Sequence, residues 1–469
     1  MGKGINKYIK ASVFYMFGNG IGQGIIFLSS IIFTRIMTQE DYGLYTTYYS
    51  VVTILNTLVG ANLFNGLNNA YIDYKDNVHK YRASNLFLST IVFAAVSVIT
   101  IIATRFISVG IPLTLIIMAL IHAYGFFVLT YYRYSANMEN KYVPNTVFMI
   151  LPNVLQVAFS IVFIKCLPTS GVNARVIGST LGVGVCAIAV YIYMISGQLK
   201  HLVTKEYWKF GLAISVPSVL SSISYMLMSQ CDHLMITAFK GAEETAVYGL
   251  IYNIGFILVA VMQATNGVLS AWLYRTLDSN DITGVRKVQK WYLFVYGAVA
   301  TCVLMISPEV IKIMSPESYW QFEYVAPFVI ASYLMVMYSF YTIIGLFYKK
   351  STMISICVVI AAVINFATNA VFIPRFGGIA AAFTSAGSYL VLFIMLRFVG
   401  QKLYKNLFSL TTFIISFAII VALGVLFNFV YSIIWLRYAV YIAILVVAGI
   451  YVLLKKSEWV SILKEKGTE

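Results

Sequence analysis

One acidic residue lies deep within an apolar segment of this chain. Asp232 precedes Lys240 by eight residues, which places it about 12 Å from the end of a helix that rises roughly 1.5 Å per residue. An ionisable side chain in hydrocarbon is costly and is therefore a candidate for function. Asp232 could bind a proton or a sodium ion, or pair with a cation in a cavity. The structural alternative is a local hydrogen-bonded pair with His233 or Gln230.

A histidine in another apolar segment is the second candidate for ion coupling. His122 lies near the middle of residues 111–132, beside Tyr124. Imidazole titrates close to neutral pH, which suits a group that exchanges protons. A buried histidine with a structural hydrogen bond is the alternative. Asp232 and His122 are therefore the predicted ion-coupling residues, with H⁺ or Na⁺ as the coupled ion and no other cofactor.

Polar side chains recur at helical spacing in four apolar segments, so each segment carries them on one face. The segments are 11–34, 42–64, 210–239 and 247–274. We predict that these faces line a hydrated cavity between two halves of the chain, because polar groups in hydrocarbon need partners or water. Helix packing through small and polar residues is the alternative. The predicted substrate-binding residues of this cavity are Asn19, Gln23, Asn56, Tyr225, Asn253, Gln263 and Asn266.

Three arginines at the ends of apolar segments are further candidates for substrate binding. Arg35, Arg133 and Arg275 each present a planar guanidinium, which can hold a phosphate through two parallel hydrogen bonds. Arg35 could instead cap a helix and pair with Glu40 or Asp41. Arg133 and Arg275 could instead anchor the chain at the membrane surface. No phosphate-binding loop motif is present, so the sequence does not indicate ATP as the energy source.

The composition indicates a membrane protein. Hydrophobic residues make up 60% of the 469 residues and charged residues only 10%, with a mean hydropathy of +0.85. A soluble domain carries about 25% charged residues, so this chain has too few to cover a surface in water. The net charge of +15 would suggest nucleic acid as the partner of a soluble protein, but here the basic residues lie in short connections between apolar segments. The five cysteines lack metal-ligand spacing, and no metal site is predicted.

Fourteen segments are apolar enough to cross a bilayer as helices, for which about 20 residues are needed. With the amino terminus in the cytoplasm, 24 of the 32 basic residues fall on the cytoplasmic side. This positive-inside bias supports the helix count and predicts that both termini are cytoplasmic. The segments are 11–34, 42–64, 84–104, 111–132, 144–165, 175–196, 210–239, 247–274, 291–313, 323–348, 351–373, 379–396, 408–431 and 438–454.

Short patterns that recur at one spacing indicate an internal duplication. Two patterns recur 206 residues later: Tyr42-Gly43-Leu44 as Tyr248-Gly249-Leu250, and Pro168, Gly171 and Ala174 as Pro374, Gly377 and Ala380. A third recurs after 201 residues, Asn65-Gly66 as Asn266-Gly267, which a small loop deletion would explain. The offset corresponds to six helices, an even number, so the two copies share one orientation.

The predicted fold is therefore an all-α polytopic membrane protein with 14 transmembrane helices. Helices 1–6 and 7–12 form two parallel six-helix repeats, and helices 13–14 are additional. The amino-terminal lobe covers residues 1–200 and the carboxy-terminal lobe residues 201–400. Residues 401–469 contain the two additional helices and a cytoplasmic tail. The longest connection, residues 65–83, is too short for a soluble domain.

Parts of the chain resemble a known family. Residues 33–45 resemble the junction of the first two helices in polysaccharide flippases, and Asp232 followed by Tyr248-Gly249 is similar to a second copy of that motif. Residues 365–382, which include Asn365, Asn369 and Pro374, resemble their helix 11–12 junction. These are the oligosaccharide-lipid (O-antigen and capsule repeat-unit) flippases of the multidrug/oligosaccharidyl-lipid/polysaccharide exporter (MOP) superfamily. The resemblance covers most of the first twelve helices.

The resemblance implies a transporter and not an enzyme. Such a flippase moves an undecaprenyl-pyrophosphate-linked oligosaccharide, a repeat unit of O-antigen lipopolysaccharide or of capsule or exopolysaccharide, across the bacterial cytoplasmic membrane by alternating access. The implied partners are this glycan lipid, the bilayer and other polysaccharide-assembly membrane proteins, with no nucleic acid. The family's motif residues are largely structural.

The nearest alternatives are a cation-coupled multidrug exporter of the same superfamily and a flippase for the peptidoglycan precursor lipid II. A membrane-bound glycan polymerase or ligase is a remote alternative, because the outer connections are short and carry no paired histidines and acids.

Overall fold

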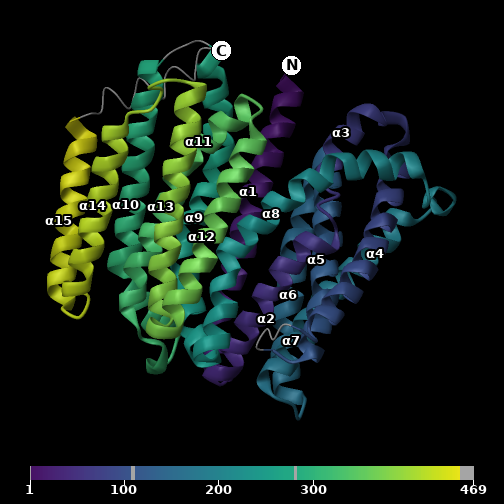
Figure 1. The fold of residues 1–469 in the computed structure, drawn as a ribbon, viewed down its shortest axis with the longest axis horizontal. Helices are drawn as coiled ribbons and strands as arrows, with labels where there is room; N and C mark the ends of the chain where they lie inside the picture. Colours follow the sequence, from purple (N-terminus) through teal and green to yellow (C-terminus); the bar gives the residue numbers. More distant parts are fainter. Residues whose placement is uncertain (1, 107–110, 279–281, 455–469) are drawn as a thin grey trace. The chain divides into compact units, whose positions relative to one another are not determined.

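The computed structural model describes residues 2–106, 111–278 and 282–454, and these ranges contain fifteen α-helices and no β-strand (Figure 1). Fourteen helices coincide with the predicted segments, which confirms the all-α membrane fold, and α3 is the additional one. The predicted cytoplasmic tail from residue 455 lies outside the described residues. The helices are α1 (Gly2–Ile36), α2 (Gln39–Val59), α3 (Asn65–Asp73), α4 (Val78–Ala103), α5 (Leu113–Met138), α6 (Tyr142–Cys166), α7 (Gly171–Ile195), α8 (Lys205–Lys240), α9 (Ala242–Asp278), α10 (Ile282–Met314), α11 (Val325–Phe347), α12 (Ser351–Phe376), α13 (Gly378–Leu403), α14 (Leu410–Val430) and α15 (Ile434–Leu454).

Most of these helices meet the requirements for crossing a membrane. Eleven helices of the described chain are long and apolar enough, and α1 and α15 contain shorter apolar stretches, Gly20–Ile36 and Ile434–Ile450. The remaining predicted span, α2, carries many tyrosine, threonine and serine side chains. The protein is accordingly a multi-pass membrane protein.

The region from residue 65 to residue 83, predicted as a connection, is instead mostly helical. It contains α3, a short 3₁₀ turn at Lys75–Asn77 and the beginning of α4. The prediction failed because α3 is too short and too polar to register as a span. A second correction concerns Pro374, which lies in the last turn of α12 and not after it.

The described chain packs into two compact units. Unit 1 runs to Leu250 and adds Met314–Tyr319 and Ser355–Ser385, and unit 2 contains Ile251–Ile313, Trp320–Ile354 and the chain from Ala386. In unit 1, side chains of α2, α4, α5 and α7 form one hydrophobic core. In unit 2, α11 is buried along almost its whole length. The units are defined by packing and not by sequence repeat, so the lobe boundaries at residues 200 and 400 stay a prediction.

The repeated Tyr-Gly motif lies near the beginnings of α2 and α9, where its glycines allow close approach. A Cβ atom on Gly43 would lie 1.7 Å from the carbonyl oxygen of Ala242, and one on Gly249 would lie 2.5 Å from Cγ2 of Thr46. In a close-packed interior neither atom fits without a shift of its neighbours. The two copies of the motif therefore form equivalent halves of one contact between α2 and α9.

The second repeated pattern caps a helix in each repeat. The backbone N–H of Gly171 at the start of α7 donates to the carboxylate of Asp41 at 3.2 Å. The backbone N–H of Gly378 at the start of α13 donates to the carboxylate of Glu244 at 2.5 Å. Both acids lie in the first turns of their own helices, α2 and α9. A carboxylate satisfies the open N–H groups of a helix start, so both repeats have this kind of contact, although the donor in the second copy, Gly378, follows the matched Gly377.

Replacing Gly43 by alanine should lower the melting temperature of the purified protein by several degrees, because overpacking costs about 1–3 kcal/mol. Gly184 in α7 is the matched control, since it is also a helical glycine but a Cβ there meets nothing within 4 Å. Gly184→Ala should be neutral or slightly stabilising, because alanine favours a helix by about 1 kcal/mol. Equal melting temperatures of the two variants in detergent would contradict the close contact at Gly43.

Candidate functional site

A buried carboxylate held by three neutral donors is the most distinctive polar site of unit 1. Asp232 on α8 is 2% exposed. Its oxygens accept hydrogen bonds from the hydroxyl of Tyr248 at 2.7 Å, the amide of Asn369 at 2.5 Å and the hydroxyl of Ser385 at 2.6 Å. The donors lie on α9, α12 and α13, so four helices meet at one carboxylate.

A second layer of polar side chains orients these donors. The amide nitrogen of Asn369 also lies 3.2 Å from Oδ1 of Asn365, one turn earlier on α12. The hydroxyl of Thr384 donates to Oδ1 of Asn369, and the amide of Asn365 donates to Oγ of Ser385 at 3.4 Å. The two asparagines of the predicted helix 11–12 junction therefore serve the Asp232 site.

The partners of Asp232 are not those of the structural alternative, a local pair with His233 or Gln230. The carboxylate is held by distant residues, whereas His233 packs edge-on against the ring of Tyr248, with ring centroids 5.0 Å apart. No lysine or arginine of the described residues forms an ion pair with Asp232. A buried carboxylate without a cationic partner is costly, and here only two hydroxyl groups and one amide N–H group compensate its charge.

His122 belongs to a separate cluster in unit 1. It is fully buried on α5, and its Nδ1 lies 2.9 Å from the hydroxyl of Tyr48. That hydroxyl also lies 3.0 Å from Oγ1 of Thr180, and the imidazole stacks on Phe126 with centroids 4.7 Å apart. This environment matches the structural alternative, and the ion-coupling role of His122 stays a prediction.

The predicted substrate-binding residues fall into two groups by exposure. Gln23, Asn253 and Gln263 are exposed, although they lie in apolar helices. Asn56 and Asn266 each have a buried Oδ1 without a hydrogen-bond partner. Tyr225 is half-buried, and the side chain of Asn19 lies outside the described part of the chain. Exposed amides and unpartnered oxygens both call for water or a ligand, as a hydrated cavity would supply.

Arg35 and Arg275 lie in the final turns of their helices, and Arg133 lies five residues before the end of α5. Arg35 on α1 and Arg275 on α9 are exposed, and Nε of Arg275 donates to the carbonyl of Ala271 at 3.4 Å. Arg133 on α5 is half-buried, and its Nε has no hydrogen-bond partner. The role of the three arginines towards a phosphate stays a prediction.

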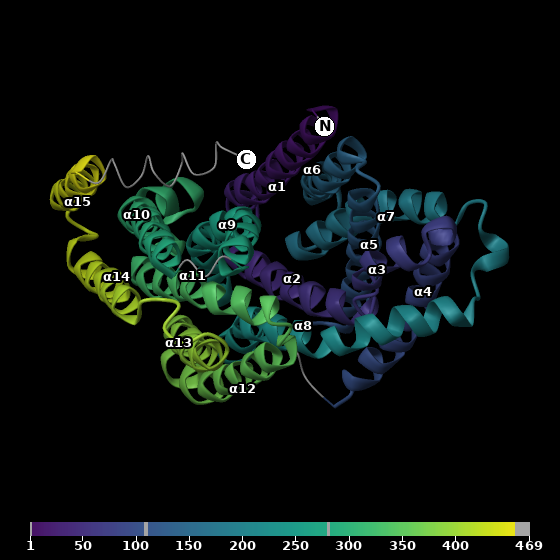
Figure 2. The ribbon, with the colours of Figure 1, turned by 90° about the horizontal axis from the view of Figure 1, so that it is seen from above.

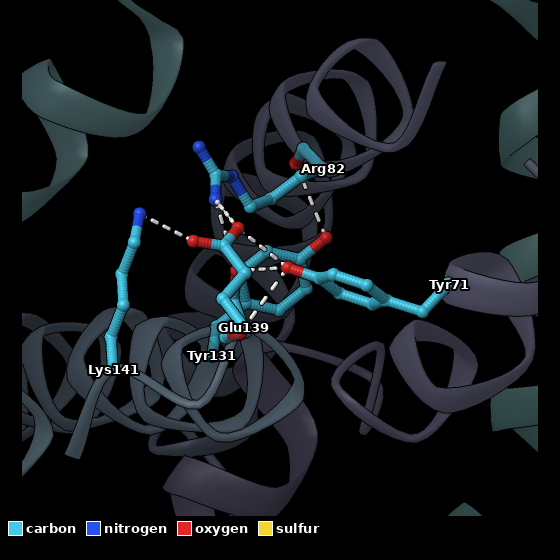
Figure 3. Close-up of polar contacts among 6 residues, drawn as sticks. Tyr71, Arg82, Tyr131, Glu139 and Lys141 are labelled. Atoms are coloured by element: carbon cyan, nitrogen blue, oxygen red, sulfur yellow. Dashed lines mark hydrogen bonds and ion pairs between the residues drawn. The ribbon is translucent and has the colours of Figure 1, made fainter. Parts of the chain in front are cut away.

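A charged cluster that the sequence analysis did not identify joins α3, α4, α5 and α6 (Figure 3). Nη1 of Arg82 lies 2.8 Å from Oε1 of Glu139, and Nζ of Lys141 lies 2.5 Å from Oε2. The hydroxyl of Tyr71 donates to Oε1 of Glu139 at 2.7 Å. Ser135 connects Tyr71 and Arg82, with its Oγ 2.9 and 3.0 Å away from them. Arg82 had been assigned to a loop, so its burial could not be foreseen.

The electrostatics of this cluster fix its charge. Burial alone would raise the pKa of the Glu139 carboxyl, but hydrogen bonds from Lys141 and Tyr71 and the charge of Arg82 outweigh it, so the pKa lies below its ordinary value. The hydrogen bond to Glu139 raises the pKa of Lys141. Burial raises the pKa of Tyr71 to about 12. At neutral pH the cluster thus holds one anion between two cations and ties α3 to the ends of α4 and α5.

A second buried arginine of unit 1 is enclosed by aromatic rings. The guanidinium of Arg175 lies 3.5 Å from the ring centroid of Tyr45 and 3.8 Å from that of Phe33. Cation–π attraction compensates part of its desolvation. Arg175 was predicted at the edge of the segment 175–196, and its contacts with Phe33 and Tyr45 connect α7 to the α1–α2 junction.

Unit 2 contains an apolar cavity of about 670 Å³. It is lined mainly by α10, α14 and α15, which lie side by side in Figures 1 and 2. One charged side chain, Lys290, lines it together with a few hydroxyl groups, among them Thr301, Tyr333 and Ser416. The cavity depends on α14 and α15, the two helices outside the duplication.

An ion pair fastens α15 to α10 beyond this cavity. Nη2 of Arg437 contacts Oε1 of Glu309, and Arg437 is 1% exposed. Nη1 of Arg437 also donates to the carbonyl of Tyr431 at 3.4 Å. Arg437 had been assigned to an outer loop, and no sequence pattern links it to Glu309.

Comparison with known proteins gives a family and a fold. The family model described as polysaccharide biosynthesis protein matches residues 9–273, which is more than half of the chain. Lsg locus putative protein 1 of Haemophilus influenzae is 22% identical over 175 residues, which cover 36% of this chain and 43% of that protein. The match thus spans less than half the length of this curated relative.

Two solved structures have the same fold. The lipid II flippase MurJ in an inward closed conformation has a TM-score of 0.67 at 13% identity, covering 96% of this chain and 99% of that chain. An inward-facing multidrug resistance MATE family transporter of the MOP superfamily has a TM-score of 0.58 at 15% identity, covering 83% and 96%. Together with the family match, these likenesses confirm the predicted resemblance.

Replacing Glu139 by glutamine should lower the melting temperature in detergent at pH 7 by a few degrees, because Arg82 and Lys141 lose their shared anion. Since the folded-state pKa of Glu139 is lowered, its contribution is present above the ordinary carboxyl pKa of 4.5 and is lost as the pH falls through the folded-state value. The difference from the unmodified protein should therefore shrink below about pH 4.

Glu206→Gln is the matched control for this change. Glu206 also accepts a tyrosine hydrogen bond, from Tyr74 at 3.0 Å, but it is exposed. Its replacement should have little effect. Equal losses of stability for the two variants would show that the ion pairs around Glu139 contribute nothing.

Proposed function

We propose that this protein is a flippase for an undecaprenyl-pyrophosphate-linked oligosaccharide. The chain belongs to the polysaccharide biosynthesis protein family, which supports this proposal. The substrate would be a repeat unit of O-antigen or of capsule or exopolysaccharide, carried across the bacterial cytoplasmic membrane by alternating access. Both termini of the protein would lie in the cytoplasm, as the distribution of basic residues predicts.

The observation that carries this proposal is the apolar cavity of unit 2. Its volume of about 670 Å³ lies in the range of ligand sites, but its lining is almost entirely aliphatic and aromatic. A polyprenyl chain needs such a lining, whereas a sugar does not. Lys290 adds one positive charge, which suits the neighbourhood of a pyrophosphate. A substrate with both a long apolar chain and an anionic group fits this arrangement best.

Polar residues of α1 and α9 would bind the sugar and pyrophosphate groups of the same substrate. Exposed amides at Gln23, Asn253 and Gln263 could hydrogen-bond to sugar hydroxyls, and the exposed arginines Arg35 and Arg275 could hold the pyrophosphate. In this proposal they face the hydrated cavity expected from the sequence, because amides exposed to lipid would be costly.

The energy source in this proposal is an ion that binds at Asp232. The carboxylate has three neutral hydrogen-bond donors and no lysine or arginine partner among the described residues. A proton or a sodium ion would compensate the charge, and its arrival or departure would change the packing of the four helices that meet there. Coupling then requires only that the two transport states bind this ion differently.

The related activities remain the rival candidates. The MATE transporter covers 83% of this chain, whereas MurJ covers 96%, and α14 and α15 form most of the apolar cavity. A drug exporter has no evident use for that cavity, so the geometry favours a lipid-linked substrate. A flippase for lipid II would use the same cavity and differs only in the sugar.

Deletion of the gene should trap lipid-linked repeat units in the inner leaflet, measured by their protection from an external glycosidase or lectin. Restoring the unmodified protein should return them to the outer leaflet. Normal delivery in a deletion strain that has no second flippase would contradict the proposal. A trapped lipid II pool instead would favour the peptidoglycan alternative, and unchanged glycan delivery with lost drug resistance would favour the exporter.

Two variants of α10 sharpen this complementation. Ala298→Phe fills the apolar cavity, which Ala298 lines, and should abolish most delivery. Val295→Phe places the same ring on an exposed position of α10 outside the cavity lining and should complement normally. If both variants complemented equally well, the substrate would not pass through the cavity.

Asp232→Asn should reduce transport at least tenfold and abolish its dependence on pH or sodium, because a charged hydrogen-bond acceptor is worth about 1.5–3 kcal/mol. Ser385→Ala is the matched control, since it removes one donor but keeps the carboxylate, and it should only shift that dependence. Initial rates in proteoliposomes across a range of pH and sodium concentration measure both effects. Unchanged rates in the asparagine variant would remove Asp232 from the mechanism.

A further inference from the structure

The turn between α2 and α3 has an unusual backbone. Residues 60–64, which we call the corner, separate the end of α2 from the start of α3. Ala61 and Asn62 have left-handed φ values of 44° and 52°. Asparagine tolerates this conformation, whereas for alanine it carries a steric cost. Such residues persist only where surrounding contacts hold them, and they are typical of switch regions.

The corner also accounts for the mismatch between the two repeats. The Tyr-Gly motifs are 206 residues apart, whereas Asn65-Gly66 and Asn266-Gly267 are 201 apart. The first repeat therefore has five extra residues between these landmarks, which is the length of the corner. In the second repeat the corresponding stretch lies within α9, which continues without a break. The corner is thus an insertion that belongs to the first repeat alone.

The corner and the first residue of α3 direct two asparagine amides onto α8. Nδ2 of Asn62 donates to Oγ of Ser222 at 3.0 Å, and Nδ2 of Asn65 donates to Oγ of Ser218 at 2.9 Å. Asn62 is 3% exposed, so its amide would be left unsatisfied in the interior if this bond were absent. The two bonds fall one helical turn apart on the same face of α8.

Both of these hydrogen bonds reach α8 just after a bend in that helix. Pro217 lies inside α8 directly before Ser218, and a proline removes a helical hydrogen bond and kinks the helix. In Figure 1 the first part of α8 crosses the other helices of unit 1, and its second part runs along them. A Cβ on Gly66 would lie 3.5 Å from Cα of Gly211, so α3 also presses against the part of α8 before the bend.

We propose that the corner is a bracket that holds α8 in a bent form, and that α8 straightens when Asn62 and Asn65 release it. The bracket is a strained insertion whose polar contacts to α8 are confined to the bend. Asp232 lies on the same helix, ten residues beyond Ser222 and about 15 Å along its axis. Ser218, Ser222 and Asp232 all lie after Pro217, so release of the two hydrogen bonds frees the part of α8 that carries the Asp232 carboxylate.

The proposal concerns the shape of unit 1 and does not depend on the substrate. It is tested by the distance between spin labels at Lys209 and Lys240, which are exposed on either side of the bend. The labels go into the full-length protein with its five native cysteines replaced. A straight helix would separate these Cα atoms by about 46 Å, and a bent one by less.

In the protein with an unmodified corner, the distance between the labels at Lys209 and Lys240 should be mainly short. The double change Ser218→Ala and Ser222→Ala removes both bracket bonds and should raise the ratio of straight to bent molecules about tenfold. Ser221→Ala is the matched control, because Ser221 bonds only to the carbonyl of Ser218 within its own helix at 3.0 Å. Its distance distribution should equal that of the unmodified corner.

Ala61→Gly tests the bracket in the opposite direction. Glycine adopts the left-handed conformation freely, so the short distance should become more populated and more narrowly distributed. This variant favours the native backbone conformation, so the protein should fold normally and the result can be interpreted. Identical distributions for the double serine variant, Ser221→Ala and Ala61→Gly would show that the kink at Pro217 is static and would overturn the proposal.

Discussion

Hydrocarbon offers no hydrogen bonds, and this one constraint governs the fold. Every backbone group within the bilayer must be satisfied by the chain itself, which leaves helices as the only element in the described residues. Hydroxyl groups follow the same rule. Thr47 and Ser50 return their protons to carbonyls of their own helix, at 3.0 and 3.1 Å. Because the rule is obeyed almost everywhere, the polar groups that reach beyond their own helix identify where the structure does something specific.

The buried charges show three different solutions to this constraint. Arg82 and Arg437 each contact a glutamate, so that desolvation is offset by an ion pair. Arg175 contacts aromatic rings and keeps its charge without a carboxylate. Asp232 has neutral donors only, and it is the one buried acid of the described chain. The first two solutions join helices through the charge itself, whereas in the last the charge is held by neutral hydrogen-bond donors alone.

The sequence predicted well what depends on local periodicity and composition. The helices followed from runs of apolar residues, and the recurring Tyr42-Gly43 and Gly171 were recognised as landmarks of a duplication. Their contacts explain the recurrence, because a glycine is needed where α2 meets α9 and an acid is needed where α7 begins. Such contacts are repeated whenever the chain is duplicated, so they leave a trace in the sequence.

Partners that meet once in the fold leave no such trace. Asp232 was recognised as unusual, but Asn369 and Ser385 lie 137 and 153 residues away along the chain, and no spacing rule connects them. Arg82 was assigned to a connection because the beginning of α4 carries charged and polar side chains and does not resemble a span, and its partner Glu139 lies 57 residues away. Apolar periodicity fixes the helices, but the pairing of single polar groups depends on how the helices pack.

The two repeats share their framework and differ in what they add to it. Both cap a helix with an acid, through Asp41 in one and Glu244 in the other. Only the first has the corner and the cage around Arg175, and only the second has a buried carboxylate at Asp232. A symmetric framework gives two states of similar free energy, but it provides no direction. Direction requires that one repeat respond to an ion to which the other is indifferent. If the ion proposed for this protein binds at Asp232, it would act on α8, the helix that Asn62 and Asn65 of the first repeat contact.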